Sequence, residues 1–255
     1  MKDSNLLIGA ISGNYSVQDI QRWVETSNFE NVERVLLLYN SKENPQLQEY
    51  LKQNNVGVVF PTFDFFGQEK EVFETNTGRV TLDNSYELIH NIRFLHIATY
   101  ASGTDHEKIF ITDVKDVYFN SNPFDRTPSD KIVTTGEVVR YDNEPWNMEH
   151  LQINLGVAGM SMLDKEVRNV GVFGGNAALV VALCKDIYLM SVGKLKVADQ
   201  TSFNYLINNS YKDKVVHTSI DDLFAVHLQV VASGRVEFDL NNINKYTIVH
   251  QYDRL

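Results

Sequence analysis

The sequence predicts an α/β fold of the Rossmann type, with a mixed, mainly parallel central sheet flanked by helices. Three short apolar runs near the N-terminus have the length and composition of buried strands: residues 6–11, 35–39 and 56–60. These runs are continuous rather than alternating, which is typical of strands covered by helices on both faces. Segments 17–24 and 45–53 lie between them and carry helical signals, an amphipathic period in the first and an N-terminal proline in the second. This alternation of strand and helix indicates parallel strands joined by crossover helices.

Further elements are predicted along the rest of the chain. We expect helices at 86–100, 177–190 and from 199 onward, and strands at 109–111, 132–139, 153–160, 215–217 and 228–231. Residues 62–85 show no clear period and are expected to be irregular or to form a short helix with loops. Residues 142–150 are expected to form a polar loop. The chain shows no internal repeat and no low-complexity linker, so one domain is expected.

Composition excludes some classes of function. The 255 residues carry a formal net charge of −10, which argues against a sequence-independent nucleic-acid binder because no basic stripe is present. The single cysteine, Cys184, cannot form an internal disulfide, which fits a reducing compartment or a buried thiol. No apolar run approaches the roughly 18 residues needed to span a membrane. The first residues do not resemble a signal peptide, and we therefore expect a soluble, cytoplasmic protein without a membrane span.

Two carboxylates follow the strand predicted at 109–111. Asp113 and Asp116 come directly after it, with Lys115 between them. In open α/β sheets ligands bind at the carboxyl ends of the strands. Carboxylate oxygens are also the ligands that Mg²⁺ and Mn²⁺ prefer, often together with substrate phosphates. The pattern therefore favours a divalent metal site; the alternative is that Asp113 caps a turn and Asp116 is merely solvated.

Four motifs in order along the chain carry a resemblance to a known family. They comprise residues 113–119 together with 122–124, then 174–176, 199–204 and 249–254. Together they resemble the GT-A class of nucleotide-sugar-dependent glycosyltransferases, in a bacterial and viral form with an Asp-x-x-Asp version of the usual Asp-x-Asp (DxD) metal motif. Lys115 stands where the common motif has its second acid. The resemblance thus implies metal binding by Asp113, Asp116 or both, without deciding which binds directly.

The resemblance implies a single GT-A domain over residues 1–255. Its nucleotide-binding part would cover about 1–125, and its acceptor and donor-sugar part about 126–255. The implied activity is a divalent-metal-dependent hexosyl or pentosyl transfer in glycan biosynthesis. The donor would be a UDP- or GDP-linked sugar, the acceptor a hydroxyl of a glycan or another molecule, and the cofactor Mn²⁺ or Mg²⁺.

The resemblance and the predicted topology also suggest site residues. The metal ligands would be Asp113, Asp116 and His250. Donor contacts are expected from Asn14, Tyr15, Tyr39, Arg93, Asp113, Gly174, Gly175 and Gln200. Asp199 would bind sugar hydroxyls or act as a general base towards the acceptor, a role that a carboxylate in segment 141–149 can also fill.

Each of these assignments has a simpler alternative. His250 can be an ordinary packed or surface histidine, and Arg93 can pair with a neighbouring acid. Asp199 can be a helix N-cap, worth on the order of 1 kcal/mol. Gly174 and Gly175 offer close backbone approach and N–H groups at a helix N-terminus, or simply form a turn.

Three other functions were weighed. A nucleotidyltransferase that makes nucleotide sugars would usually show a glycine- and lysine-rich phosphate loop after the first strand, whereas residues 12–15 here read Ser-Gly-Asn-Tyr. A phosphatase with a nucleophilic aspartate would want a second acid two residues later, where Lys115 stands. An inactive nucleotide- or carbohydrate-binding protein of the same fold is the non-enzymatic alternative.

Overall fold

A seven-stranded sheet forms the centre of the molecule. The computed structural model describes residues 4–39, 44–61, 74–75, 78–79, 85–194 and 197–254. The strands of the central sheet are β1 (Asn5–Ser12), β2 (Val32–Tyr39), β3 (Gly57–Val59), β6 (Lys108–Thr112), β8 (Ile132–Arg140), β9 (Glu166–Asn176) and β10 (Val215–Thr218). In space they follow the order β10-β8-β9-β6-β1-β2-β3. Only β9 is antiparallel to its neighbours, so the predicted mixed, mainly parallel sheet is confirmed.

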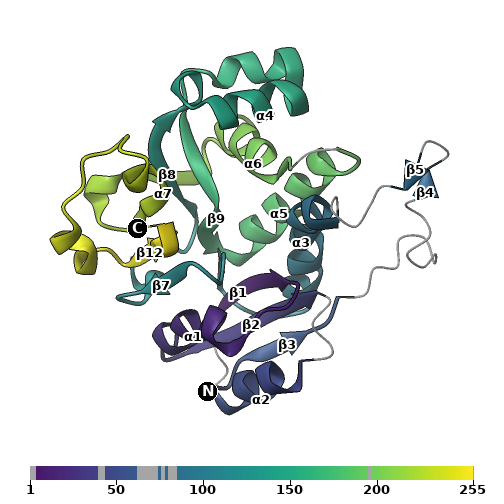
Figure 1. Ribbon diagram of the computed structural model, residues 1–255, viewed down its shortest axis with the longest axis vertical. Helices are drawn as coiled ribbons and strands as arrows, with labels where there is room; N and C mark the ends of the chain where they lie inside the picture. Colours follow the sequence, from purple (N-terminus) through teal and green to yellow (C-terminus); the bar gives the residue numbers. More distant parts are fainter. Residues whose placement is uncertain are drawn as a thin grey trace.

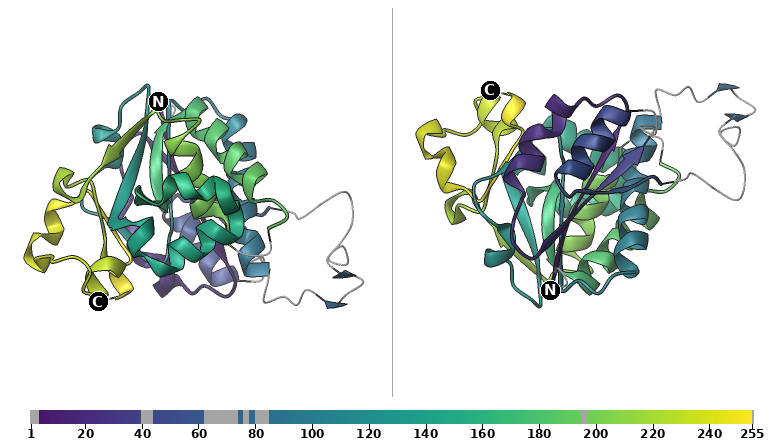
Figure 2. Two further views of the ribbon diagram at one scale, coloured as in Figure 1. Left: turned by 90° about the horizontal axis from the view of Figure 1, so that it is seen from above. Right: turned by 90° about the horizontal axis from the view of Figure 1, so that it is seen from below.

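Helices cover both faces of this sheet. They are α1 (Val17–Thr26), α2 (Pro45–Gln53), α3 (Ser85–Ser102), α4 (Pro145–Leu155), α5 (Ala177–Ser191), α6 (Asp199–Asn208) and α7 (Leu228–Ala232). Helices α3, α5 and α6 share one core with Ile109 and Ile111 of β6, whereas α1 and α2 share the opposite core with Phe110. Figure 2 shows α3 and α5 side by side, on the side of the sheet away from the yellow C-terminal segment. Within the described residues, no helix combines the length and the apolar character that crossing a membrane requires.

A small second sheet brings the end of the chain back to the middle. Its strands are β7 (Val117–Phe119), β11 (Ala225–His227) and β12 (Ile248–His250), in the order β11-β12-β7. Strand β12 runs antiparallel to β7 and places His250 opposite Val117. Figure 1 shows this yellow segment against β7. A separate pair, β4 (Glu74–Thr75) and β5 (Gly78–Arg79), belongs to the segment expected to be irregular, most of which lies outside the described residues.

The structure contradicts the predictions for three segments. The expected loop at 142–150 and strand at 153–160 are instead helix α4 and a 3₁₀ helix, Gly156–Met162. Pro145 occupies the first turn of α4, the Glu144 carboxylate accepts a 2.6 Å hydrogen bond from the backbone N–H of Asn147, and Gly156 ends the helix at φ +55°. The expected strand at 228–231 is helix α7. In the two apolar runs, 153–160 and 228–231, packing decided the conformation over the local preference of valine and isoleucine.

The order of the strands creates a switch point beside β6. From β1 the chain moves outward through β2 and β3, and α3 then returns it to β6 on the other side of β1. The carboxyl ends of β1 and β6 therefore lie next to each other where the direction of winding reverses, which is the usual ligand position in such sheets. The indole Nε1 of Trp23 in α1 donates a 2.9 Å hydrogen bond to the hydroxyl of Thr112, which secures the end of β6.

Gly174→Ala tests the close contact between β6 and β9. A Cβ at this position would lie 2.6 Å from the carbonyl oxygen of Ile109 and against the ring of Phe110, so the two strands would have to separate. We expect the free energy of unfolding to fall by about 1–3 kcal/mol, measured by urea denaturation. Gly103→Ala is the matched control, because its Cβ would meet only the Tyr100 carbonyl oxygen at 3.4 Å. Equal stability of the two variants would contradict the described packing.

Candidate metal centre

The structure brings Asp113, Asp116 and His250 together. One ligand atom of each lies within 4.8 Å of those of the other two. The imidazole Nε2 of His250 is 3.4 Å from Oδ2 of Asp113 and 3.6 Å from Oδ1 of Asp116. Asp113 follows β6, Asp116 precedes β7, and His250 ends β12. Three residues separated by up to 137 positions thus converge at the switch point, and this arrangement was expected from the resemblance.

Backbone hydrogen bonds fix the three groups. The N–H of Gln251 donates to the carbonyl of Asp116 at 2.7 Å, which holds His250 beside that residue. The N–H of Asp113 donates to the carbonyl of Gly171 in β9, also at 2.7 Å. Gly171 has no Cβ, and one built there would collide with the carboxylate of Asp113. The absence of a side chain at Gly171 therefore leaves room for the carboxylate.

The charges of the trio favour a cation between the carboxylates. Burial alone would lower the pKa of His250, but the carboxylates of Asp113 and Asp116 outweigh burial and raise it to about 9. Burial would raise the pKa of Asp113, yet Arg93 and His250 hold it well below its usual value. His250 Nε2 is buried at ion-pair distance from both acids, but it makes no well-directed hydrogen bond. The trio thus holds a positive charge, either a proton on His250 or a metal ion, and two carboxylates with one imidazole form a suitable donor set for a divalent cation.

Arg93 connects this trio to Asp199. Its buried guanidinium donates from Nη1 to Oδ1 of Asp113 at 2.7 Å and from Nη2 to Oδ2 of Asp199 at 3.2 Å. The expected contact of Arg93 with a donor stays a prediction, because the contacts that the structure describes are with the chain's own acids.

Asp199 is buried in this network and is not an N-cap. The N-cap position of α6 belongs to Ala198, and Asp199 is the first helical residue. Burial would raise the pKa of Asp199, but His90, whose Nδ1 lies 3.7 Å from its carboxylate, and Arg93 lower it. A carboxylate with a lowered pKa is a poor proton acceptor, which argues against the general-base role expected for Asp199.

A polar network adjoins the trio, and of its members only Gln200 was predicted from the sequence. The amide Nδ2 of Asn169 donates to Oε1 of Glu137 at 2.7 Å, and its Oδ1 accepts from the N–H of Gly171 at 2.8 Å. Gln200 accepts from the N–H of Val170 at 3.3 Å and donates to Oδ1 of Asn147 at 2.9 Å. Burial raises the pKa of Glu137. The available signal was the presence of single polar residues within otherwise apolar strand segments.

Gln200 therefore lies near the metal centre, and its contact with a donor stays a prediction. Two other residues predicted to contact the donor lie farther from the centre. Gly174 and Gly175 lie within β9, paired with Phe110 and Ile109 towards the start of β6, and thus towards the edge of the sheet opposite Asp113. Both glycines come just before helix α5, as expected, but at the edge of the sheet away from Asp113, and their contact with a donor stays a prediction.

The remaining predicted contacts follow β1 and β2. Tyr39 is 1% exposed and its hydroxyl is 2.7 Å from Nδ1 of His96, so its ring is buried in the core. Its contact with a donor stays a prediction. Asn14 is exposed and Tyr15 is half-buried, both at the carboxyl end of β1, and their contact with a donor stays a prediction.

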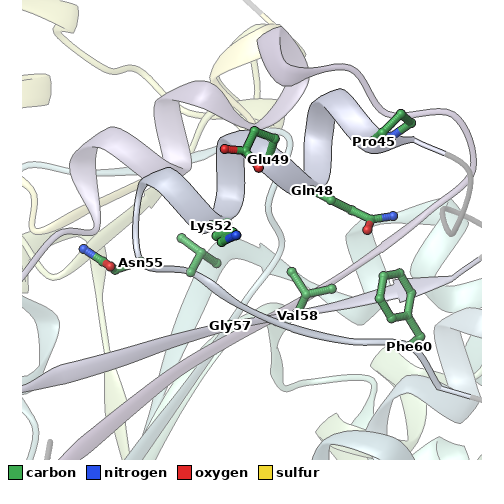
Figure 3. A pocket seen from close by; sticks show the side chains of 9 residues that line it. Pro45, Gln48, Glu49, Lys52, Asn55, Gly57, Val58 and Phe60 are labelled. Carbon is green, nitrogen blue, oxygen red and sulfur yellow. The ribbon is translucent and has the colours of Figure 1, made fainter.

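A separate surface hollow lies away from the metal centre. A hollow of about 590 Å³ runs along α2 and β3 and is lined by residues that include Gln48, Lys52, Val58 and Phe60 (Figure 3). Strand β3 is the outer strand of the sheet, separated from β6 by β2 and β1. Among the described residues that line it there is one carboxylate, Glu49, and no histidine or cysteine, so this lining differs from the convergent chemistry of the metal centre. We assign the functional site by chemistry rather than by the size of the hollow.

Comparisons with known proteins add no family to this description. No model of a known protein family matches the chain, and a search of curated proteins found no match.

Removal of a ligand should abolish tight metal binding. We expect isothermal titration of the wild type with MnCl₂ to give one saturable site, and Asp116→Ala and His250→Ala to lose it, because each removes one of three converging ligands. Asp130→Ala is the control, since Asp130 is exposed and precedes β8, whose start lies at the opposite edge of the sheet. Unchanged binding in both ligand variants would refute the assignment.

Asp199→Asn should destabilise the protein in a pH-dependent way. The lowered pKa of Asp199 means that its carboxylate stabilises the fold at neutral pH, and that this contribution is lost as pH falls through the folded-state value. Urea denaturation at pH 7 should show a loss of roughly 3 kcal/mol, because Arg93 keeps only one of its two acids. The difference in the free energy of unfolding between Asp199→Asn and the wild type should become smaller below about pH 4, where the carboxyl of Asp199 is protonated in the unfolded chain. A difference in stability that grows towards low pH would contradict the lowered pKa of Asp199.

Proposed function

We propose that this protein is a metal-dependent glycosyltransferase that moves a hexosyl or pentosyl group from a nucleotide-diphospho-sugar to a hydroxyl of a glycan or another acceptor. The observation that carries the proposal is the position of the metal centre. Asp113, Asp116 and His250 converge at the switch point of a mainly parallel sheet, with a buried imidazole nitrogen facing two carboxylates. This is the place and the donor set for a divalent ion that also contacts phosphate oxygens.

The chemistry of the donor explains why such a centre is needed. A nucleoside diphosphate leaves with negative charge, and Mn²⁺ or Mg²⁺ bound by the trio would act as a Lewis acid that neutralises it. Arg93 keeps Asp113 ionised and in place. Glu137, Asn169 and Gln200 supply hydrogen-bonding groups beside the centre, of the kind that recognise sugar hydroxyls.

Of the alternatives, the nucleotidyltransferase fits the sequence less well than a glycosyltransferase. A nucleotidyltransferase would use a glycine- and lysine-rich loop after β1, and the segment Ser12–Tyr15 contains one glycine and no lysine. A binding protein without activity would retain donor and metal binding but would not turn the donor over. Turnover therefore separates the proposed enzyme from an inactive protein of the same fold.

A donor screen tests the proposal. UDP- and GDP-linked sugars, each with Mn²⁺ or with a chelator, are added to the wild type and to Asp116→Ala, and the midpoint of thermal unfolding is measured. Binding to the native state raises this midpoint by mass action. We expect one or two donors to raise it in the presence of metal only, and the increase to disappear in Asp116→Ala but to persist in the Asp130→Ala control.

Release of the nucleoside diphosphate is then followed with the donors that bind. Slow hydrolysis that requires metal and Asp116 would support a transferase, since water can replace an absent acceptor. Binding without any turnover, also in the presence of glycan acceptors, would favour the inactive binding protein. Failure of all donors to bind would overturn the donor site.

A further inference from the structure

A buried hydrogen-bonded chain leads away from His250. Its Nδ1, on the side of the ring opposite the carboxylates, lies 2.9 Å from Nδ1 of His227. Nε2 of His227 lies 3.0 Å from the hydroxyl of Thr135 in β8. That hydroxyl donates a 2.9 Å hydrogen bond to the carbonyl oxygen of Val172 in β9. Neighbouring parallel strands set the contact between the two rings, because His227 of β11 and His250 of β12 are paired in register.

The last hydrogen bond, from Thr135 to Val172, determines where each proton of the hydrogen-bonded chain lies. A carbonyl oxygen only accepts, so the single proton of the Thr135 hydroxyl points to Val172 and the hydroxyl oxygen accepts from His227. His227 therefore carries its proton on Nε2. His227 is buried, and the described partners of its two ring nitrogens are the Thr135 hydroxyl and the His250 ring rather than a carboxylate, so the ring is neutral; Nδ1 of a neutral ring with Nε2–H is an acceptor. The hydrogen bond between the two rings then requires the proton on Nδ1 of His250.

We propose that Thr135 and His227 are positioning residues that hold the proton of His250 on Nδ1, so that Nε2 is the atom left to bind a metal between Asp113 and Asp116. This inference rests on the metal centre of the proposed function. It assigns a role to two residues that touch neither metal nor donor and that act through His250. If the hydrogen bonds ran in the opposite direction, His227 would donate to His250, and the proton of the neutral His250 ring would lie on its Nε2, where the metal has to bind. The Thr135 and Val172 oxygens would then face each other without a proton between them.

The protonation of His227 can be observed without metal, donor or acceptor. Long-range ¹H–¹⁵N spectra of the metal-free wild type distinguish an imidazole nitrogen that carries a proton from one that does not. We expect His227 to show a proton on Nε2 and none on Nδ1, and His250 to show a proton on Nδ1. The signals of His227 are assigned by their loss in the His227→Asn variant. A proton on Nδ1 of His227 would overturn the inference, even if the protein binds metal and transfers sugar.

Manganese affinity tests the consequence. Thr135→Val keeps the shape of the side chain but removes the acceptor of His227 Nε2–H, so His227 can take the other tautomer and donate to His250. We expect the dissociation constant for Mn²⁺, measured by electron paramagnetic resonance of the free ion, to rise roughly 10- to 100-fold. Thr135→Ser retains the hydroxyl and should bind Mn²⁺ nearly as tightly as wild type.

The two measurements exclude a merely structural role. Loss of packing at Thr135 would lower the free energy of unfolding without moving a proton between the nitrogens of His227. Thr135→Val with wild-type affinity for Mn²⁺, or Thr135→Ser as weak as Thr135→Val, would overturn the inference. If Thr135→Val does not fold, the spectra of the wild type still decide the protonation. Absence of Mn²⁺ binding in a wild type with the expected spectra would count against the metal centre rather than against the hydrogen-bonded chain.

Discussion

Arg93 buries its charge between two carboxylates that come from different parts of the chain. Asp113 follows β6 and Asp199 begins α6, while Arg93 itself lies in α3. A buried charge without a partner is very costly, so these three elements can pack closely only when all three groups meet. The ion pairs thus tie the position of Asp113, a predicted metal ligand, to the packing of the helical layer on one face of the sheet. The metal centre depends on this arrangement.

The third ligand depends on the pairing of β12 with β7. His250 is brought next to Asp116 because the last strand runs antiparallel to the short strand that follows the acids. Gln251, directly after His250, has a left-handed φ of +60°, an uncommon conformation for a residue other than glycine. This conformation turns the chain so that the N–H of Gln251 meets the carbonyl of Asp116. Backbone strain of this kind persists where surrounding contacts enforce it, often at functional sites.

A similar irregularity lies in β8. The pairing of β8 with β9 shifts in register after Thr134, and Val138 has φ +60°, which is rare for a β-branched residue. Such bulges redirect side chains at sheet edges. Here the irregular segment contains Glu137, which is buried against Asn169 beside the metal centre. Thr135 of the same segment connects His227 to the carbonyl oxygen of Val172 in the hydrogen-bonded chain that begins at His250. The shape of β8 therefore supports both the polar network and the orientation of a ligand.

The sequence by itself determined the α/β class and the first strand–helix alternation, because buried strands and amphipathic helices leave local periodic patterns. It also placed Asp113 and Asp116 at a strand end, since both follow one apolar run closely. The association of His250 with them came from the resemblance of ordered motifs rather than from any local pattern. Helix α7 was missed because a short apolar run fits a strand as well as a buried helix, and helix α4 was missed because its polar first half resembles a loop.

Only the tertiary structure decided which residues meet. The reversed direction of β9 moved Gly174 and Gly175 away from the metal centre, and strand direction is not encoded in an apolar run. The pairing of Arg93 with Asp113 and Asp199, and the contact of His227 with Thr135, join residues about 20 to more than 100 positions apart. Each of these residues is an ordinary polar side chain in its local sequence. Its role follows from strand order and helix packing, because these long-range contacts determine which buried charges and hydrogen-bonding groups become partners.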